Sequence, residues 1–311
     1  MKNYILYHGN CPDGFGAAFA AWLRFGYGAE YIPVSYGKPV PDMITGDETA
    51  VYIVDFSYPT HEIEDMITSH GRVVVLDHHA TARTELESLM PEYGADPYLI
   101  RFDMEKSGAV LAWEYFHHDT AVPEFFLYLQ DRDLWQFKLD QSREVSMALR
   151  SYPYDFYRWQ SISGIYGPIR IPVDREMDAL SKLKSEGVAC RRLTEQQVDN
   201  MAKHHRWAYI DTKHQKITFT EKLEPGGNGE PMVPAQIDIM PVSNATVFFS
   251  EVGEKLLEMY PAMNCAAYYT DRSDGRRQWG LRSRSTFDCS KVAKAFGGGG
   301  HKQASGFVQA V

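Results

Sequence analysis

Continuous apolar runs that alternate with helical patterns dominate the first 80 residues of the chain. The runs 3–8 (NYILYH), 50–56 (AVYIVDF) and 72–77 (RVVVLD) are rich in Val, Ile, Leu and aromatic residues. Between them, 14–26 has helical spacing, and 59–71 opens on Pro and Thr and closes on Gly. Strands without polar alternation, separated by helices, are typical of a parallel sheet covered on both faces.

The texture of the chain changes further on. Helical patterns continue through 107–119, 122–135 and parts of 141–165, and a long charged amphipathic stretch covers 174–206. The later segments are expected as strands at 210–222, 234–240 and 245–251, a loop at 223–233, a hairpin of 264–271 with 276–285, and helices at 253–261 and 287–301.

These patterns predict an α/β protein in three parts. Residues 1–175 form a mostly parallel sheet with helices on both faces. Residues 176–206 form a helical connector, weakened near Gly187, and residues 207–311 form a smaller C-terminal α/β domain. The length of 311 residues agrees with more than one domain.

Composition excludes several classes of protein. The net charge of -9 is opposite to the basic face that long duplex DNA requires, but short or single-stranded substrates stay open. The four cysteines lie far apart and form no CxxC pair, so we expect neither a structural zinc site nor a disulfide framework. No apolar run reaches the ~18 residues of a membrane helix, and the start lacks a signal-peptide pattern. We expect a cytoplasmic protein.

Three predicted strands end on residues that commonly bind metals. The first ends on His8, with Asp13 five residues later, the second on Asp55, and the third on the run Asp77-His78-His79. In an open parallel sheet the carboxyl ends of the strands share the edge where ligands bind. A single strand-end acid is usually a helix cap. Three consecutive strand ends with ligand-type residues favour a site for Mn²⁺ or a similar divalent ion.

Further acids and histidines elsewhere in the chain could also bind a metal. Asp131 and Asp133 follow an apolar helical pattern, and Asp131 is the better candidate for a fourth acidic ligand. The pairs His117-His118 and His204-His205 end polar helical stretches, where a cation favours the helix dipole, so a structural role is expected for both.

The C-terminal domain offers a candidate substrate clamp. Four consecutive glycines let a backbone approach a ligand closely and expose its N–H groups. A pair of guanidiniums two residues apart on one strand face fits a phosphate or carboxylate, although a solvated strand face is an equal alternative. The candidate residues are Arg282, Arg284, Gly298, Gly299, Gly300 and His301.

Together these motifs resemble the DHH phosphoesterase superfamily, in the subfamily with a DHHA1 domain. HGNCPDG, VYIVDFS, VLDHHAT and LQDRDLW stand for its successive motifs, and LRSRSTFDCSKVAKAFGGGGHKQASGF is similar to the DHHA1 signature. The resemblance covers nearly the whole chain. That group includes RecJ-type exonucleases, nano-RNases that also act on pAp, and cyclic-dinucleotide phosphodiesterases.

The resemblance implies a role for each matched residue. One Mn²⁺ ion would be held by His8, Asp13 and Asp55. Asp55 would bridge to a second ion held by His78 and Asp131. Asp77 would orient or ligate, and His79 would lie near the attacking water or the phosphate. Asp77, His78 and His79 are thus the expected catalytic residues, and Arg282 and His301 would hold the substrate.

The expected function is hydrolysis of a phosphodiester or phosphomonoester in a small nucleotide or short single-stranded oligonucleotide by metal-activated water. The cofactor would be one or two Mn²⁺ ions, with Mg²⁺ or Co²⁺ as alternatives, and a homodimer stays open. Phe15 stands where the family usually has a second acid. A nucleotide-binding regulatory module is therefore one alternative, and a single-strand-specific exonuclease is another.

Overall fold

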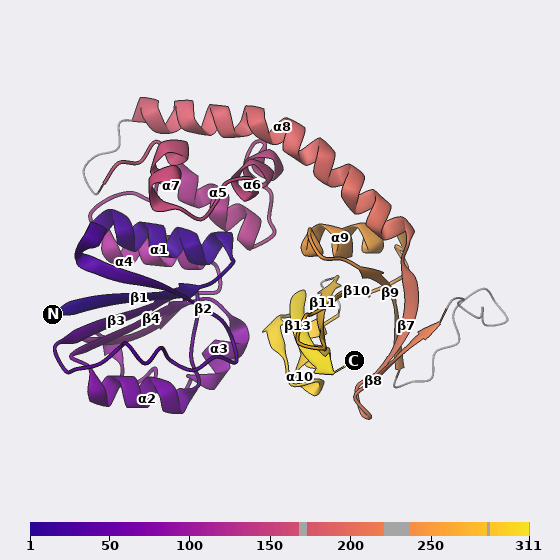
Figure 1. The fold of residues 1–311 in the computed structure, drawn as a ribbon, viewed down its shortest axis with the longest axis horizontal. Coiled ribbons are helices and arrows are strands. Elements are labelled where there is room, and N and C mark those ends of the chain that lie inside the picture. Colours follow the sequence, from indigo (N-terminus) through magenta and orange to yellow (C-terminus); the bar gives the residue numbers. More distant parts are fainter. Residues whose placement is uncertain (168–172, 221–236, 285–286, 311) are drawn as a thin grey trace. The chain divides into compact units, whose positions relative to one another are not determined.

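The computed structural model describes residues 1–167, 173–220, 237–284 and 287–310 (Figure 1). The chain divides into two compact units, Met1–Arg191 and Arg192–Val311. Each unit combines one β-sheet with helices, which confirms the predicted α/β class.

The first unit carries a six-stranded sheet in the order β2-β1-β3-β4-β6-β5. Its elements are β1 (Lys2–His8), α1 (Pro12–Phe25), η1 (Gly26–Gly28), β2 (Ala29–Val34), β3 (Thr49–Val54), α2 (Thr60–Ser69), β4 (Arg72–Asp77), α3 (Ala80–Glu85), β5 (Gly94–Ala95), β6 (Tyr98–Phe102), α4 (Gly108–Phe116), α5 (Glu124–Asp133), α6 (Ser142–Arg150), α7 (Phe156–Ser163) and most of α8 (Val173–Lys203). All neighbours are parallel except β5 and β6. Because β1 pairs with β2 on one side and β3 on the other, the strand order reverses at β1.

Helices cover both faces of this sheet, as predicted (Figure 1). Successive residues of β4 enter opposite cores: Val74 packs with α1, α4 and α5, whereas Val75 packs with the face that holds α2. Every residue of β3 is buried. The uninterrupted apolar runs of the sequence are therefore the consequence of a sheet with no solvent face.

The second unit is built on a seven-stranded sheet in the order β12-β13-β11-β10-β9-β7-β8. Its elements after α8 are β7 (Arg206–Asp211), β8 (Lys216–Thr220), β9 (Ile237–Asn244), α9 (Phe249–Met259), β10 (Cys265–Asp271), β11 (Arg276–Ser283), α10 (Cys289–Ala295), β12 (Gly299–His301) and β13 (Ala304–Ala310). Only the pair β9–β10 is parallel. The hairpin predicted across RSDG is present as β10–β11.

Some sequence predictions differ from the structure. The strand expected at 245–251 is wrong, because α9 begins at Phe249, directly after Phe248 in a left-handed conformation (φ 54°). Val252 and Leu256, at helical spacing, are fully buried there. The short elements β5, β6 and α3 have no counterpart among the predictions. The loop predicted at 223–233 lies outside the described residues.

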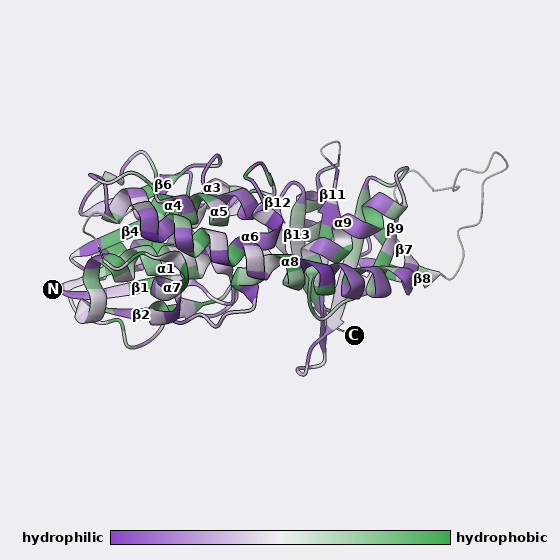
Figure 2. Ribbon diagram, turned by 90° about the horizontal axis from the view of Figure 1, so that it is seen from above, coloured by the Kyte–Doolittle hydropathy of each residue, from purple (hydrophilic) through white to green (hydrophobic). Residues whose placement is uncertain are grey.

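The predicted connector, residues 176–206, overlaps with α8 (Val173–Lys203), a helix that runs without interruption through Gly187 and across the boundary between the two units. Hydrophilic and hydrophobic residues alternate along it (Figure 2). A Cβ atom on Gly187 would lie 2.0 Å from the carbonyl oxygen of Glu144 in α6. This glycine is therefore a contact position between helices rather than a weak point. None of the described helices is both long enough and apolar enough to cross a membrane.

Candidate metal centre

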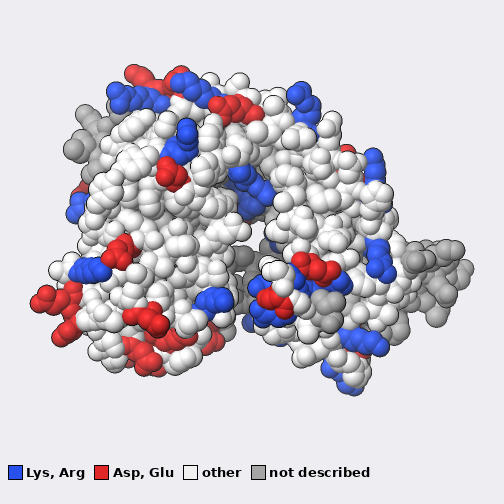
Figure 3. Space-filling model, viewed as in Figure 1, with Lys and Arg blue, Asp and Glu red and all other residues white. Residues whose placement is uncertain are grey.

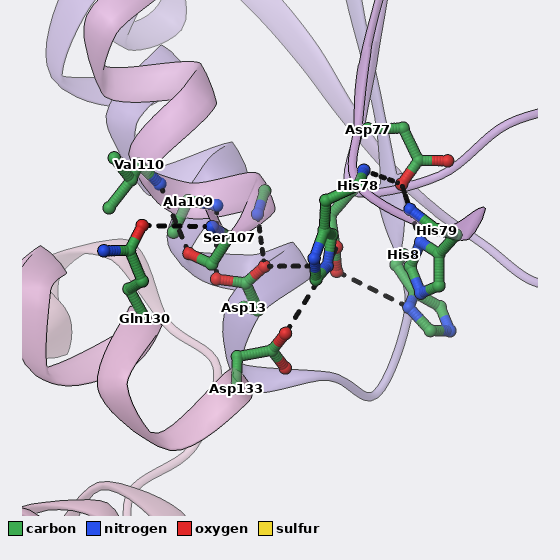
Figure 4. Close-up of polar contacts among 12 residues, drawn as sticks. His8, Asp13, Asp77, His78, His79, Ser107, Ala109, Val110, Gln130 and Asp133 are labelled. Carbon is green, nitrogen blue, oxygen red and sulfur yellow. Dashed lines mark hydrogen bonds and ion pairs between the residues drawn. The ribbon is translucent and has the colours of Figure 1, made fainter. Parts of the chain in front are cut away.

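The carboxyl ends of three neighbouring strands in the first unit meet at one edge of the sheet. His8 is the last residue of β1, Asp55 follows β3 directly, and Asp77 ends β4. Because β1, β3 and β4 are parallel neighbours, these positions lie side by side at the point where the strand order reverses. Figure 4 shows the side chains of this edge together with those from α1, α4 and α5.

Asp55 occupies the middle of the cluster. Its Oδ1 lies 3.2 Å from Nε2 of His78, and its Oδ2 lies 3.5 Å from Nδ1 of His8. The residue has a left-handed backbone (φ 55°), held by a hydrogen bond from its N–H to the Leu76 carbonyl. A Cβ on Gly108, the first residue of α4, would lie 2.4 Å from the Asp55 Cβ, so only glycine lets this helix approach.

Two groups of potential ligands lie at this edge, and Asp55 belongs to one of them and contacts His78 of the other. One consists of His8, Asp55 and His79, and the other of Asp13, His78 and Asp133; within each group the donor atoms all lie within 4.8 Å of one another. Among the described residues, the buried atoms Nδ1 of His8 and Oδ2 of Asp55 make no hydrogen bond. A divalent cation would satisfy both, and mixed carboxylate and imidazole ligands suit such an ion. The residues present therefore fit a metal centre.

Asp13 joins the group of His78 rather than that of His8. Its Oδ2 is 3.8 Å from His78 Nε2 and accepts a hydrogen bond of 2.6 Å from the N–H of Gly108, while Oδ1 accepts one from Ala109. The carboxylate thus also caps the amino end of α4. Burial raises the pKa of Asp13 well above its ordinary value, and the charges of Asp55 and Asp133 add to this. A bound cation would relieve that repulsion.

Asp77 is directed at its own loop. Oδ2 accepts a hydrogen bond of 2.7 Å from Ser57 Oγ, and Oδ1 accepts from the N–H groups of His78 and His79 and from Nδ1 of His79 at 2.6 Å. Of the two roles expected for Asp77, this arrangement supports orientation of His79. Because Asp77 holds Nδ1 of His79, Nε2 is the ring nitrogen with which His79 would bind a metal.

The two histidines of the motif carry raised pKa values. Burial alone would lower the pKa of His78, but its hydrogen bond with Asp55 and the charges of Asp133, Asp55 and Asp13 raise it to about 10. Burial also opposes protonation of His79, yet the Asp77 carboxylate raises its pKa to about 9. A metal binds neutral imidazole, so binding of a metal at these histidines would release protons.

The two aspartates of α5 have different partners in the structure. Both oxygens of Asp131 accept backbone hydrogen bonds, from Lys138 at 2.9 Å and Leu139 at 3.0 Å, and so stabilise the loop after α5. Asp133 faces the cluster instead, with Oδ2 3.4 Å from His78 Nε2. Asp133 lies four residues after buried Leu129, on the same helix face, which is a signal that the sequence contains.

Phe15, the departure from the family pattern, belongs to an aromatic part of the core. It is 2% exposed, and its ring stacks on those of Tyr154 and Phe156 at 5.2 and 4.8 Å.

In the second unit, Arg284 has a structural role. Its Nη2 donates a hydrogen bond of 2.7 Å to the Leu257 carbonyl in the last turn of α9, and its Nε donates to the Met263 carbonyl. A guanidinium at this end of a helix also favours its dipole. Arg282 donates to Ser250 Oγ in the first turn of α9 and to the Leu281 carbonyl. The predicted pair is thus spread along the two ends of one helix.

The glycine run forms a hairpin of β12 with β13, in which Gly300 pairs with Ser305 and His301 with Ala304. A Cβ on Gly298 would lie 2.1 Å from the Gly306 carbonyl oxygen, and Gly300 has φ 131°. Close backbone contact within the fold therefore accounts for these two glycines. Substrate binding by Gly298, Gly299, Gly300 and His301 stays a prediction.

Tyr36 is a site residue that no sequence signal indicated. It follows β2, and its ring centroid lies 5.7 Å from that of His8 and 6.2 Å from that of His79. Phe56 supports it from 4.5 Å, yet the side chain is 53% exposed. An aromatic surface therefore lies beside the group of His8, Asp55 and His79.

The sequence of the chain is similar to that of a viral protein. No known protein-family profile matches it. An uncharacterized protein of Acanthamoeba polyphaga mimivirus is 31% identical over 322 residues, which cover 98% of this chain and 66% of that relative. The chain thus spans just under two thirds of the relative's length.

Solved structures are similar at low identity. A pGpG-specific phosphodiesterase, PggH, from Vibrio cholerae shares 13% identity, with 100% of this chain and 94% of that chain covered and a TM-score of 0.41. RecJ from Thermus thermophilus, in complex with Mn²⁺, shares 14% identity, with 99% and 49% covered and a TM-score of 0.42. Similarities of this size leave the activity to be inferred from the residues of the chain itself.

Proposed function

We propose that the chain is a metal-dependent phosphoesterase of the DHH type that its motifs resemble. The observation that carries this proposal is the position of Asp55. It belongs to one group of imidazole and carboxylate ligands, where it contacts His8, and it also contacts His78 of the second group. Ligands shared in this way are suited to a pair of divalent ions, for which we propose Mn²⁺.

The residues divide the work of such a site. One ion would be held by His8, Asp55 and His79, and the other by Asp55 with Asp13, His78 and Asp133. When bound, such ions lower the pKa of a coordinated water and offset the charge of a phosphoryl group. Asp77 fixes the ring of His79, and the amino end of α4 fixes Asp13, so both ligand groups are positioned before any substrate binds.

A small nucleotide or short oligonucleotide is the substrate we favour. The exposed ring of Tyr36 offers a stacking surface for a base beside the ligands. Acidic side chains gather over α2, which carries Glu62, Glu64 and Asp65 (Figure 3), and the whole chain has a net charge of -9. Such a surface disfavours a long polyanion, so the single-strand exonuclease is the weaker alternative. A cytoplasmic location and a homodimer stay predictions.

The regulatory alternative depended on a missing acid at position 15. Since Phe15 packs in the aromatic core, its identity leaves the donor atoms of both ligand groups in place. We therefore rank hydrolysis above binding without turnover.

The test is hydrolysis of pApA by the purified full-length chain in Mn²⁺ and in EDTA, followed by chromatography. We expect AMP with Mn²⁺ only. The variant Asp55→Asn should reduce turnover by more than the ~10–100-fold that loss of an outer-sphere partner costs, because a shared ligand is removed. Binding of pApA without any product in Mn²⁺, Mg²⁺ or Co²⁺ would favour the regulatory alternative. Cleavage of bis(p-nitrophenyl) phosphate but not of pApA would retain the reaction and reject the nucleotide.

A further inference from the structure

Next to the ligand Asp133, the side chain of Arg132 lines a recess at the end of α5. The recess is bounded by residues from α1, α5 and α6, namely Pro12, Asp13, Tyr128, Leu129, Arg132, Asp133, Ser146 and Leu149. Two of the proposed ligands, Asp13 and Asp133, thus share its wall with one arginine. The Arg132 side chain is 21% exposed, so it is largely enclosed yet reachable from solvent.

The guanidinium of Arg132 is only partly satisfied by the protein. Its Nη1 lies 3.9 Å from Asp133 Oδ1, which is an ion pair too long for a hydrogen bond. Its Cζ lies 5.3 Å from the ring centroid of Trp135, so the group is also held against an aromatic surface. In the part of the chain that the structure describes, the buried Nε has no hydrogen-bond acceptor. A buried donor without an acceptor is costly, which points to an acceptor supplied from outside the protein.

Charge gives the class of that acceptor. Among the proposed ligands, the carboxylates of Asp13, Asp55 and Asp133 would offset part of the charge of two divalent ions. A phosphoryl group brings further negative charge into the same place, and a guanidinium presents a planar fork of N–H donors that matches two phosphate oxygens.

We propose that Arg132 binds a non-bridging oxygen of the substrate's phosphoryl group, with the recess beside Asp13 and Asp133 as the phosphoryl pocket. The inference rests on the proposed function and extends it, because it names the residue that recognises the anion. The ring of Trp135 lies against the guanidinium, and Asp133 forms a long ion pair with it.

The test measures binding of inorganic phosphate to the Mn²⁺-loaded full-length chain by titration calorimetry, in the wild type and in Arg132→Gln and Arg132→Lys. We expect Arg132→Gln to weaken phosphate binding about 10- to 100-fold, the loss of a charge-assisted hydrogen bond, with Mn²⁺ affinity within about threefold of wild type. Arg132→Lys should lose less, because it keeps the charge but not the fork.

Arg143→Gln is the matched control. Arg143 lies over the ring of Phe137, 3.9 Å from its centroid, in the same region, but does not line the recess. Its substitution should leave phosphate binding unchanged.

Unchanged phosphate affinity in Arg132→Gln, with weaker Mn²⁺ binding, would overturn the proposal, because Arg132 would then serve Asp133 alone. An equal loss in Arg143→Gln would also overturn it. If phosphate binds through Arg132 but no phosphoester is hydrolysed, the inference holds and the proposed function fails.

Discussion

Polar residues that the sequence marks as candidate site residues lie at the edge of the first sheet and at the β11–β13 end of the second. Their contacts differ between the two places. At the first edge, His8, Asp55 and His78 come from three separate segments of the chain. The carboxylate of Asp55 nevertheless lies within 3.5 Å of a ring nitrogen of each histidine. In the second unit, Arg284 donates a hydrogen bond to helix α9, and the glycine run pairs with strand β13.

The difference teaches how a site is distinguished from scaffolding. In the folded chain, Nε and Nη2 of Arg284 each donate a hydrogen bond to a backbone carbonyl oxygen. Folding leaves Nδ1 of His8 and Oδ2 of Asp55 buried without such a bond and brings like charges together. Buried polar groups normally find hydrogen-bond partners. A cluster of buried polar groups without such partners therefore indicates a binding site for a ligand.

The largest effect is expected for Asp133→Asn against its matched control Asp131→Asn. Asp133→Asn should weaken Mn²⁺ binding by at least ~10–100-fold, because a ligand is lost, with little change in the metal-free unfolding midpoint. Asp131→Asn should retain Mn²⁺ binding but lose about 1 kcal/mol of stability, because one partly buried N–H after α5 loses its acceptor. Calorimetric titration with Mn²⁺ and thermal unfolding of both variants measure this.

The reverse result, metal binding lost in Asp131→Asn and kept in Asp133→Asn, would restore the ligand set predicted from the sequence and contradict the arrangement at α5.

An intermediate effect is expected for Arg284→Met in the second unit. Stability should fall by about 1–2 kcal/mol, because the last turn of α9 loses a charged donor, while KM for the substrate stays unchanged. Denaturant unfolding and steady-state kinetics test this, with Arg276→Met, on the exposed hairpin beside Asp274, as the control of unchanged stability. A raised KM at unchanged stability would mean that Arg284 binds the substrate, as the candidate clamp predicts.

The smallest effect concerns His117, part of a His-His pair that resembles His78-His79 in sequence alone. Its Nε2 donates to the Ala20 carbonyl and its ring stacks on Trp113 at 4.2 Å. Burial lowers the pKa of His117 below its ordinary 6.5, and the charge of Arg24 adds to this. The unfolded chain therefore binds a proton near pH 6.5 that the folded chain does not, so stability falls as the pH drops below about 6.5.

The measurement is the change in unfolding free energy between pH 7.5 and 5.5, compared with His117→Gln, which keeps a donor for Ala20. The variant should show the smaller change. Equal changes in both proteins would mean that His117 does not contribute.

Much of the fold and part of the site follow from the sequence. The apolar runs that end on His8, Asp55 and Asp77 determined the buried parallel strands, and parallel strands necessarily bring such ends to one edge. The local period of the chain thus decides both strand identity and which edge carries the chemistry. Short elements such as β6 were not predicted, because five residues with one buried position give too weak a hydrophobic pattern.

Only the tertiary structure decided how these residues divide the work. Asp131 and Asp133 are two positions apart on one helix, so they point to different sides, and their neighbours make one a loop anchor and the other a candidate ligand. The partner of Asp13, the loop held by Asp77 and the aromatic core around Phe15 likewise depend on contacts between distant segments. A sequence fixes which groups are available, but which of them remain unsatisfied depends on how the whole chain packs.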